Sequence, residues 1–295
     1  MNTRLSYPLA ALSLAVLAIF IPSHAQAAPV VRSVGGDATA ASITATRDTF
    51  RLDIGGGTTA GANGSFGGLR REINWDGVPA TASAPNTLPA NFFNTTSPRG
   101  VVFSTTGTGF EVSGATGDGG AGQPAAANFG NINATYSSTF GVFSAQRLFT
   151  ALGSITTDVN FFLPGTATAA TVAGFGAIFT DVDTVGSTTI QYFNQLDVAL
   201  AAPFIVPVGT VASQSLSFLG VSFNAGELVS RVRITSGNTA LGAAVNDNPG
   251  GGVDLVVMDD FIYSEPVPEP STLMLCTAGL AGLLSARKRN RRVSR

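Results

Sequence analysis

Hydrophobic and polar residues alternate in several short stretches of the chain. The alternation is strict over residues 50–54, and in residues 155–163 it places Val159 and Phe161 on one face. A repeat of two residues is typical of a β-strand that buries one face. The same criterion predicts further strands at residues 72–75, 101–105, 139–145, 175–181, 188–193, 196–200, 216–223, 228–235 and 255–263. No long stretch between the two ends of the chain shows a helical repeat.

Two of these ranges indicate how the strands are placed. Residues 255–258 are apolar on both faces, which predicts a strand in the middle of a sheet. Residues 231–234 alternate arginine with valine or isoleucine, which predicts one face toward solvent and one toward the core. Because glycine, asparagine, aspartate and proline separate the ranges, the sequence predicts an all-β fold over residues 28–263, a jelly-roll-like antiparallel β-sandwich.

The stretch from residue 76 to residue 99 is punctuated by proline and shows no strand pattern. It exceeds the ~12 to 15 residues at which structureless loops become uncommon. It contains Phe92 and Phe93, which either pack the loop against the core or form the rim of a binding site. We expect packing, because large aromatic side chains are usually buried.

The N-terminus has the layout of a secretory signal peptide. A short basic start is followed by an apolar run over residues 9–21 and by the small-x-small site Ala25-Gln26-Ala27. We expect residues 1–27 to direct the chain into the general secretion machinery and signal peptidase to cut after Ala27. A retained membrane helix is the alternative, but the run is shorter than the ~20 apolar residues that cross a bilayer.

The C-terminus contains three unlike features in succession. Residues 264–270 are a proline-rich spacer, residues 271–286 are an apolar run that predicts a short transmembrane helix, and residues 287–295 are a basic tail. The basic cluster consists of Arg287, Lys288, Arg289, Arg291 and Arg292. Such a cluster beside an apolar helix holds that end on the cytoplasmic side.

This order resembles the PEP-CTERM sorting signal of Gram-negative bacteria, with Val267, Pro268, Glu269 and Pro270 as the motif. The segment also resembles the C-terminal domain of some ice-binding proteins. The PEP-CTERM resemblance implies processing by an exosortase, transient anchoring in the inner membrane, and a final place at the cell surface or outside the cell. It also implies a setting of exopolysaccharide and biofilm. A permanent tail anchor is the alternative, although the apolar run is short for one.

The composition of the middle region excludes several kinds of chemistry. The only histidine is His24, the only cysteine is Cys276 and the only lysine is Lys288, and all three lie in the terminal segments. The middle region therefore contains no disulfide, no Cys or His metal site, no histidine-based serine triad and no Schiff-base lysine.

The charge of the middle region is strongly acidic. The chain has sixteen basic and eighteen acidic residues. Without the seven basic residues of the terminal segments and without Glu269, nine basic residues stand against seventeen acids. Because binding to phosphate needs clustered Lys and Arg, we expect no nucleic-acid partner.

Four aspartates are candidate ligands of a calcium ion, which prefers carboxylate and carbonyl oxygens. Asp181 ends one predicted strand and Asp183 follows it, while Asp254 directly precedes the last predicted strand and Asp260 lies within it. If these strands are neighbours, the four side chains can converge. Ordinary turn carboxylates are the alternative, because aspartate is a common turn former.

Two further possibilities concern sugars. Trp75 is either an aromatic platform for a sugar ring or a core residue, and the usual burial of tryptophan favours the core. Glu72, Glu111 and Glu227 are the glutamates from which a glycosidase would need its two carboxylates, but none lies in a recognised motif. We therefore do not expect an enzyme.

The expected function is a structural or adhesive component of an extracellular polysaccharide matrix. A carbohydrate-binding or ice-binding module is the first alternative, and a carboxylate-dependent glycosidase is a more distant one.

Overall fold

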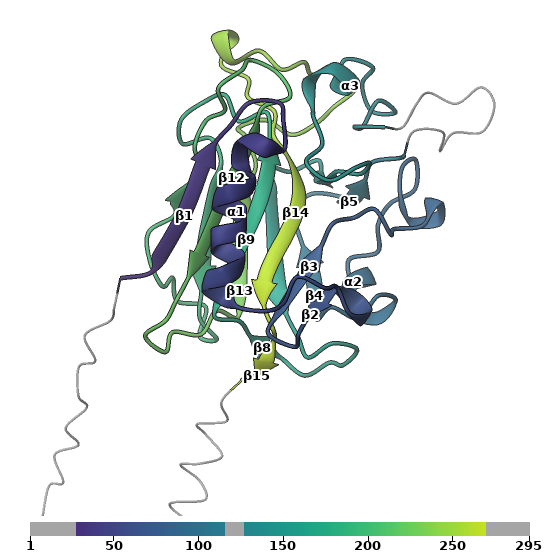
Figure 1. The fold of residues 1–295 in the computed structure, drawn as a ribbon. Helices are drawn as coiled ribbons and strands as arrows, with labels where there is room; N and C mark the ends of the chain where they lie inside the picture. Colours follow the sequence, from purple (N-terminus) through teal and green to yellow (C-terminus); the bar gives the residue numbers. More distant parts are fainter. Residues whose placement is uncertain (1–27, 116–126, 270–295) are drawn as a thin grey trace, which may run out of the picture.

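The computed structural model describes residues 28–115 and 127–269 of the chain. Two antiparallel β-sheets face each other, and a ladder of two short strands lies at one end (Figure 1). The large sheet consists of β1 (Val30–Gly35), β2 (Ser65–Phe66), β3 (Arg70–Ile73), β5 (Gly109–Val112), β6 (Phe149–Leu152), β9 (Gly174–Thr180), β12 (Leu216–Ser222) and β14 (Val257–Ser264). The second sheet consists of β4 (Val101–Ser104), β7 (Thr156–Phe161), β10 (Thr189–Phe193), β11 (Phe204–Ile205) and β13 (Arg231–Thr235). The end ladder pairs β8 (Ala170–Thr171) with β15 (Val267–Pro268).

In the part of the chain that the structure describes, three α-helices connect or cover these strands. They are α1 (Ala41–Ile54), α2 (Phe92–Thr95) and α3 (Tyr136–Thr139), and the 3-10 turns lie at Ala62–Gly64, Ala80–Ala82 and Pro249–Gly251. Among the described residues, no helix is both long and apolar enough to cross a membrane.

The strand order places β14 near the middle of the large sheet, which runs β1-β12-β9-β14-β3-β2. β6 also pairs with β14, and β5 pairs with β6. Every residue of β14 is buried. The prediction that the apolar run in residues 255–258 begins a central strand is therefore confirmed. The second sheet runs β11-β10-β13-β7-β4.

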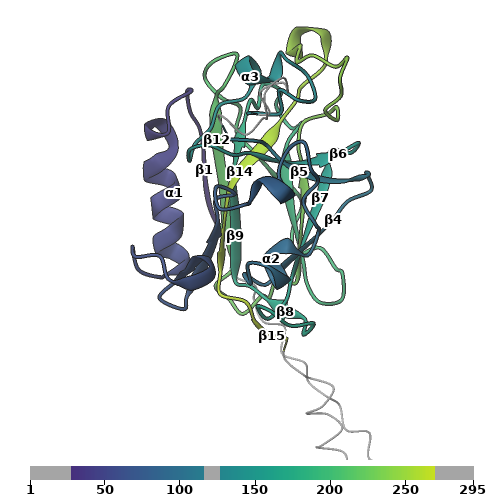
Figure 2. The ribbon, with the colours of Figure 1, turned by 90° about the vertical axis from the view of Figure 1, so that its right-hand side faces the viewer.

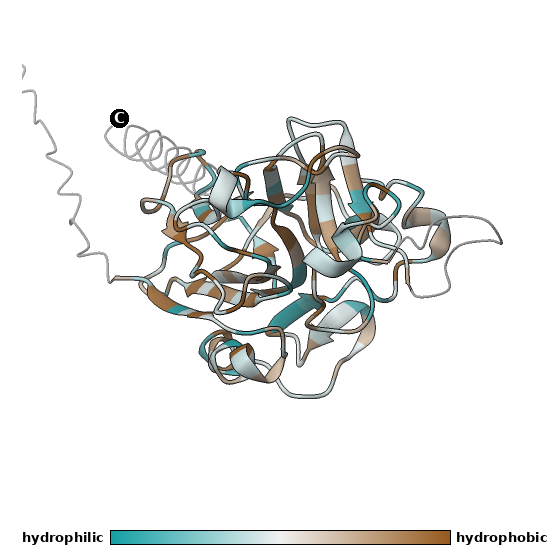
Figure 3. Ribbon diagram, turned by 90° about the horizontal axis from the view of Figure 1, so that it is seen from above, coloured by the Kyte–Doolittle hydropathy of each residue, from teal (hydrophilic) through white to brown (hydrophobic). Residues whose placement is uncertain are grey.

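The main core lies between the two sheets. β13 buries Val232 and Ile234 in it and leaves Arg231 and Arg233 on the outer face, as the alternation predicts. Both sheets contribute hydrophobic residues to this core, and in the view from above several strands in the middle of the molecule are coloured as hydrophobic (Figure 3). Each large side chain buried there contributes roughly 1.5 to 3 kcal/mol.

α1 covers the outer face of the large sheet, as Figure 2 shows from the side. Its buried residues Ile43 and Phe50 form a second apolar cluster with residues of β9, β12 and β14. Phe50 lies over two glycines: a Cβ added to Gly220 would come within 2.7 Å of its ring, and one added to Gly176 within 3.0 Å. The missing side chains at these positions let the helix approach the sheet closely.

The helix α1 corrects the prediction of a strand at residues 50–54. The alternation there spans only five residues, whereas Ile43, Phe50 and Ile54 follow the seven- and four-residue spacing of one helix face. The apolar stripe is thin because alanine, threonine and charged residues separate these positions, so the sequence shows little helical repeat.

Two other strand predictions are wrong. Residues 139–145 begin at the last residue of α3 and continue without regular structure. Residues 196–200 form a turn with one isolated bridge, between Phe193 and Ala199. The coarser prediction of a mostly β fold with two stacked antiparallel sheets is confirmed.

The long segment between residues 76 and 99 packs onto the core. Phe92 and Phe93 are 6% and 2% exposed, and Phe93 contacts the ring of Trp75 edge-on at 5.4 Å. The expectation that these aromatics hold the loop down is confirmed.

The chain leaves the sandwich at the end of β14 and immediately forms β15. The Glu265 amide donates to Leu69 O, and the Glu265 carboxylate pairs with Arg71 at 2.7 Å. Val267 and Pro268 then pair with Thr171 and Ala170. Residues 264–269 of the predicted spacer are thus attached to the sandwich. Residue 270 and the predicted segments at residues 1–27, 271–286 and 287–295 lie outside the described residues.

Candidate cation site and sorting motif

Asp181 directly follows β9, a strand buried along its whole length. Its φ is 70°, in the left-handed region that aspartate tolerates better than most residues. Its amide donates to Ser215 O at 2.8 Å, which ties the turn to the start of β12. The side chain is 0% exposed, so the backbone turn directs a carboxylate into the protein.

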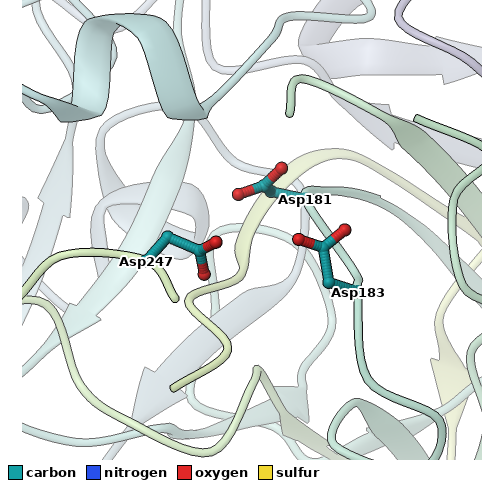
Figure 4. A group of neighbouring side chains, drawn as sticks. All are labelled: Asp181, Asp183 and Asp247. Atoms are coloured by element: carbon teal, nitrogen blue, oxygen red, sulfur yellow. The ribbon is translucent and has the colours of Figure 1, made fainter. Parts of the chain in front are cut away.

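Asp183 and Asp247 place their carboxylates beside that of Asp181 (Figure 4). One oxygen from each of the three residues lies within 4.8 Å of the other two. Asp183 is in the loop after β9, and Asp247 is in the loop between β13 and β14. Asp247 was missed by the sequence analysis, because its position depends on how that second loop folds back. The polar residues on either side of it indicate only a turn.

Asp254 lies next to this group but its oxygens are used by the backbone. They accept hydrogen bonds from the amides of Asp183 and Thr184, each at 3.2 Å. Asp254 therefore holds the loop after β9 in place rather than pointing a free oxygen into the cluster. The predicted proximity of Asp181, Asp183 and Asp254 agrees with the structure.

The electrostatics of the cluster disfavour three ionised carboxylates. Burial, with repulsion from Asp183, Asp247 and Asp254, raises the pKa of Asp181 to about 8. Burial, with repulsion from Asp247 and Asp254, raises the pKa of Asp183 to about 6. The pKa of Asp247 is also raised, mainly by burial. The charged side chains that shift these three pKa values are all carboxylates.

Asp260 does not lie with the other predicted ligands. The pairing of β14 with β9 shifts register between Met258 and Phe261, and both of these residues face the main core although they are three positions apart. This bulge breaks the alternation that would place Asp260 on the same face as Asp254. Asp254 also precedes the strand, which begins at Val257.

Asp260 instead forms a buried carboxyl pair with Asp259. Ser144 Oγ donates to both residues, at 3.2 Å to Asp259 and 2.8 Å to Asp260, and the Phe143 amide donates to Asp259. Burial is the main cause that raises the pKa of both carboxyl groups. The pair fastens the loop that follows α3 to the bulge of β14.

Trp75 is a core residue, only 1% exposed. Its ring stacks on Phe149 with centroids 4.1 Å apart, and its indole N–H donates to Asp259 O at 2.7 Å. The pocket beside it, lined also by Asn74 and Arg99, has a volume of about 130 Å³. Small-molecule sites usually occupy ~300 to 1,000 Å³. The indole ring thus has no exposed face on which a sugar can stack.

The three glutamates form separate local contacts. Glu72 accepts hydrogen bonds from Arg51 and Arg70, Glu111 accepts one from Asn131, and Glu227 accepts one from the Ala225 amide. In the described part of the chain, each of these glutamates is hydrogen-bonded to partners other than the other two.

Residues 266–292 match the family model of the PEP-CTERM protein-sorting motif, which confirms the resemblance of this segment. No curated protein and no solved structure matches the chain. The motif implies an exported protein that is processed by an exosortase and associated with the cell surface. The match includes the ordered residues of β15 and the basic cluster beyond residue 286.

Proposed function

We propose that this protein is a structural or adhesive component of an extracellular polysaccharide matrix, and that it is not an enzyme. The observation that carries the proposal is the PEP-CTERM motif at residues 266–292, which marks a chain exported for surface display. The expected partners are the secretion machinery with signal peptidase, the exosortase, and the surrounding polysaccharide.

The side chains of the β domain support a non-catalytic role. Histidine, cysteine and lysine are absent from residues 28–269. The glutamates that a glycosidase would need are used in local hydrogen bonds, as with Glu72 between Arg51 and Arg70. Hydrolysis of a glycan that is lost on substituting one glutamate would contradict this part of the proposal.

The strand order supports the finer prediction of a jelly roll. The strands β3-β14-β9-β12 face β7-β13-β10-β11, and from β7 to β14 the chain passes back and forth between the two sheets. This strand order supports two interlocked Greek keys, the jelly-roll arrangement that many lectin domains share. Because a fold alone does not define a function, the likeness supports glycan binding only together with a suitable surface.

The outer face of the second sheet is such a surface. We call it the polar sheet face and define it by Asp158, Asn160, Gln191, Arg231 and Arg233. Arg233 binds both carboxylate oxygens of Asp158 at 2.8 Å, and Arg231 lies 3.8 Å above the ring of Phe193. Amide, carboxylate and guanidinium groups on one face of a sheet can exchange hydrogen bonds with sugar hydroxyls. The face also favours the alternative of a carbohydrate-binding or ice-binding module.

Fractionation of the native host tests the proposal. We expect a mature species that starts near Ala28, ends near Pro270 and stays with the polysaccharide fraction. Enzymatic degradation of the polysaccharide should release it. Intact mass and immunoblots of the inner membrane, the outer membrane, the matrix and the medium provide the measurements.

Matched variants separate sorting from matrix binding. Replacing Pro268, Glu269 and Pro270 together by alanine should leave the chain uncleaved in the inner membrane, whereas the exposed Pro203→Ala variant should sort normally. A host without exosortase should reproduce the first result. A wild-type chain found full-length in the inner membrane would contradict sorting, and a sorted chain that is indifferent to polysaccharide removal would contradict the matrix role.

A further inference from the structure

Two loops from distant parts of the sequence converge at the end of the sandwich opposite β15. Thr180, the last residue of β9, pairs with Val257, the first residue of β14, whereas the other end of β14 leads to β15. Asp181 and Asp183 follow β9, and Asp247 precedes β14. The three carboxylates point toward one another (Figure 4).

The hydrogen bonding of Asp181 differs from that of an ordinary turn aspartate. Asp37 shows the usual pattern, since its carboxylate accepts hydrogen bonds from the amide and hydroxyl of Thr39. Neither carboxylate oxygen of Asp181 accepts a hydrogen bond from the described residues, and Asp183 Oδ2 has none either. The backbone amide of Gln214 favours the charged form of Asp181, but its hydrogen bond goes to Thr139 O.

A buried carboxylate without a partner is costly to the folded state. Burial of an unpaired charge costs several kcal/mol unless the group is neutralised or coordinated to a metal. The charges that act on Asp181 are those of Asp183, Asp247 and Asp254, so no neighbouring arginine offsets it. The cluster therefore lacks a positive charge among its described neighbours.

We propose that Asp181, Asp183 and Asp247 bind a calcium ion at this end of the sandwich. Calcium takes six to eight oxygen ligands at ~2.3 to 2.6 Å, so ligands on opposite sides of the ion lie up to about 5 Å apart. The three carboxylates, with one oxygen each within 4.8 Å of the others, fit around one such ion. Water and backbone carbonyls complete the coordination.

Asp254 is a positioning residue for this site. Its carboxylate accepts hydrogen bonds from the amides of Asp183 and Thr184 and thereby fixes the loop that carries two of the ligands. The Asp247 carboxylate accepts the Leu255 amide at 2.9 Å, which fixes the third ligand beside the start of β14. The bound ion joins the loop after β9 to the loop before β14.

Calorimetric titration of the exported protein after chelator treatment tests the proposal. At pH 8 we expect calcium chloride to bind with a dissociation constant of ~10⁻⁴ to 10⁻³ M, the range of extracellular modules. At the tighter limit, 10 mM calcium is about 100 times the dissociation constant and should raise the melting temperature by roughly 5 to 10 °C. Magnesium chloride at the same concentration should raise it less.

Isosteric variants identify the ligands. Asp183→Asn and Asp247→Asn should each lose most of the calcium-dependent rise, and they should be at least as stable as the wild type without calcium because repulsion is reduced. Asp53→Asn, at the exposed end of α1, is the matched control and should keep the full rise. The proposal is overturned if calcium gives neither heat nor a rise in melting temperature, if the two ligand variants respond like the wild type, or if magnesium acts equally.

Discussion

Asp181 links the stability of the calcium-free protein to pH. Its pKa is about 8 in the folded chain, whereas an aspartate in an unfolded chain titrates near ~4. Between these values the folded state holds a proton that the unfolded state has lost, so the free energy of unfolding should fall as the pH rises from about 4 to about 8. Asp183, with a pKa of about 6, adds to the lower part of this range.

Asp181→Asn should flatten that dependence, and urea unfolding at several pH values with chelator present measures it. The raised pKa values of Asp259 and Asp260 act in the same direction and will leave some slope. If the free energy of unfolding of the wild type and of Asp181→Asn changed with pH in parallel, Asp181 would have the same pKa in the folded and the unfolded chain, which would contradict this prediction.

Trp75 is a residue whose substitution tests the core rather than a ligand site. Its ring contacts Phe93, Phe103, Phe149 and Phe261, so Trp75→Ala should cost ~3 to 5 kcal/mol of the free energy of unfolding. Urea denaturation gives the value. Loss of glycan binding in this variant would therefore follow from unfolding.

The control for Trp75 is Leu52→Ala, whose side chain on α1 is 79% exposed and which should change stability by less than ~0.5 kcal/mol. Trp75→Phe should cost less than Trp75→Ala because it keeps an aromatic ring in the stack. Similar stability of Trp75→Ala and Leu52→Ala would contradict the core assignment.

The candidate site was only partly predictable at the residue scale. Asp181 and Asp183 are two positions apart and follow a recognisable strand, so their proximity depends on local geometry. The position of the Asp247 side chain depends on a loop of irregular shape. The face on which Asp260 lies depends on a bulge in β14, which shifts the alternation of its side chains. Neither effect leaves a signal in the alternation of hydrophobic and polar residues.

At the scale of the elements, the packing of α1 on the large sheet depends on positions in the strands beneath it that have no side chain. A Cβ at Gly220 would meet the Phe50 ring at 2.7 Å and the end of Phe218 at 2.9 Å, so one of these rings must move. Gly220→Ala should therefore lower the free energy of unfolding by ~1 to 3 kcal/mol, the usual cost of overpacking. Equilibrium unfolding in urea is the measurement.

Gly57→Ala is the matched control, because a Cβ at Gly57 meets nothing within 4 Å. We expect its stability to stay close to that of the wild type. If Gly220→Ala were equally neutral, α1 would have to sit farther from the sheet than the structure places it.

The strands that have one solvent-exposed face were predicted well, whereas the helix α1 was not. β7, β10 and β13 alternate between buried and half-exposed residues, so their sequences show the strand repeat directly. α1 buries few large residues, and its last turn happens to alternate over residues 50–54. Over so few residues, the sequence alone cannot distinguish the end of a helix that happens to alternate from a β-strand.

At the scale of the whole molecule, composition and turn residues were enough to predict two stacked sheets. The pairing of the strands was not predictable, because it joins segments far apart in the chain, such as β3 with β14 and β1 with β12. The sequence also did not predict the end ladder, because β15 contains a proline and lies in the segment predicted to be a spacer. β15 is attached to the sandwich by its ladder with β8 and by the Arg71–Glu265 ion pair beside it.

The short path from β14 to the sorting motif also determines how the molecule carries mechanical force. A pull on the C-terminal segment is transmitted first to the β8–β15 ladder and the Arg71–Glu265 pair, and then along the axis of β14. β14 is hydrogen-bonded to β9 on one side and to β3 on the other. Tension along this strand loads many of these bonds in shear at once, so a chain held by its C-terminus resists extension through a strand that is buried along its whole length.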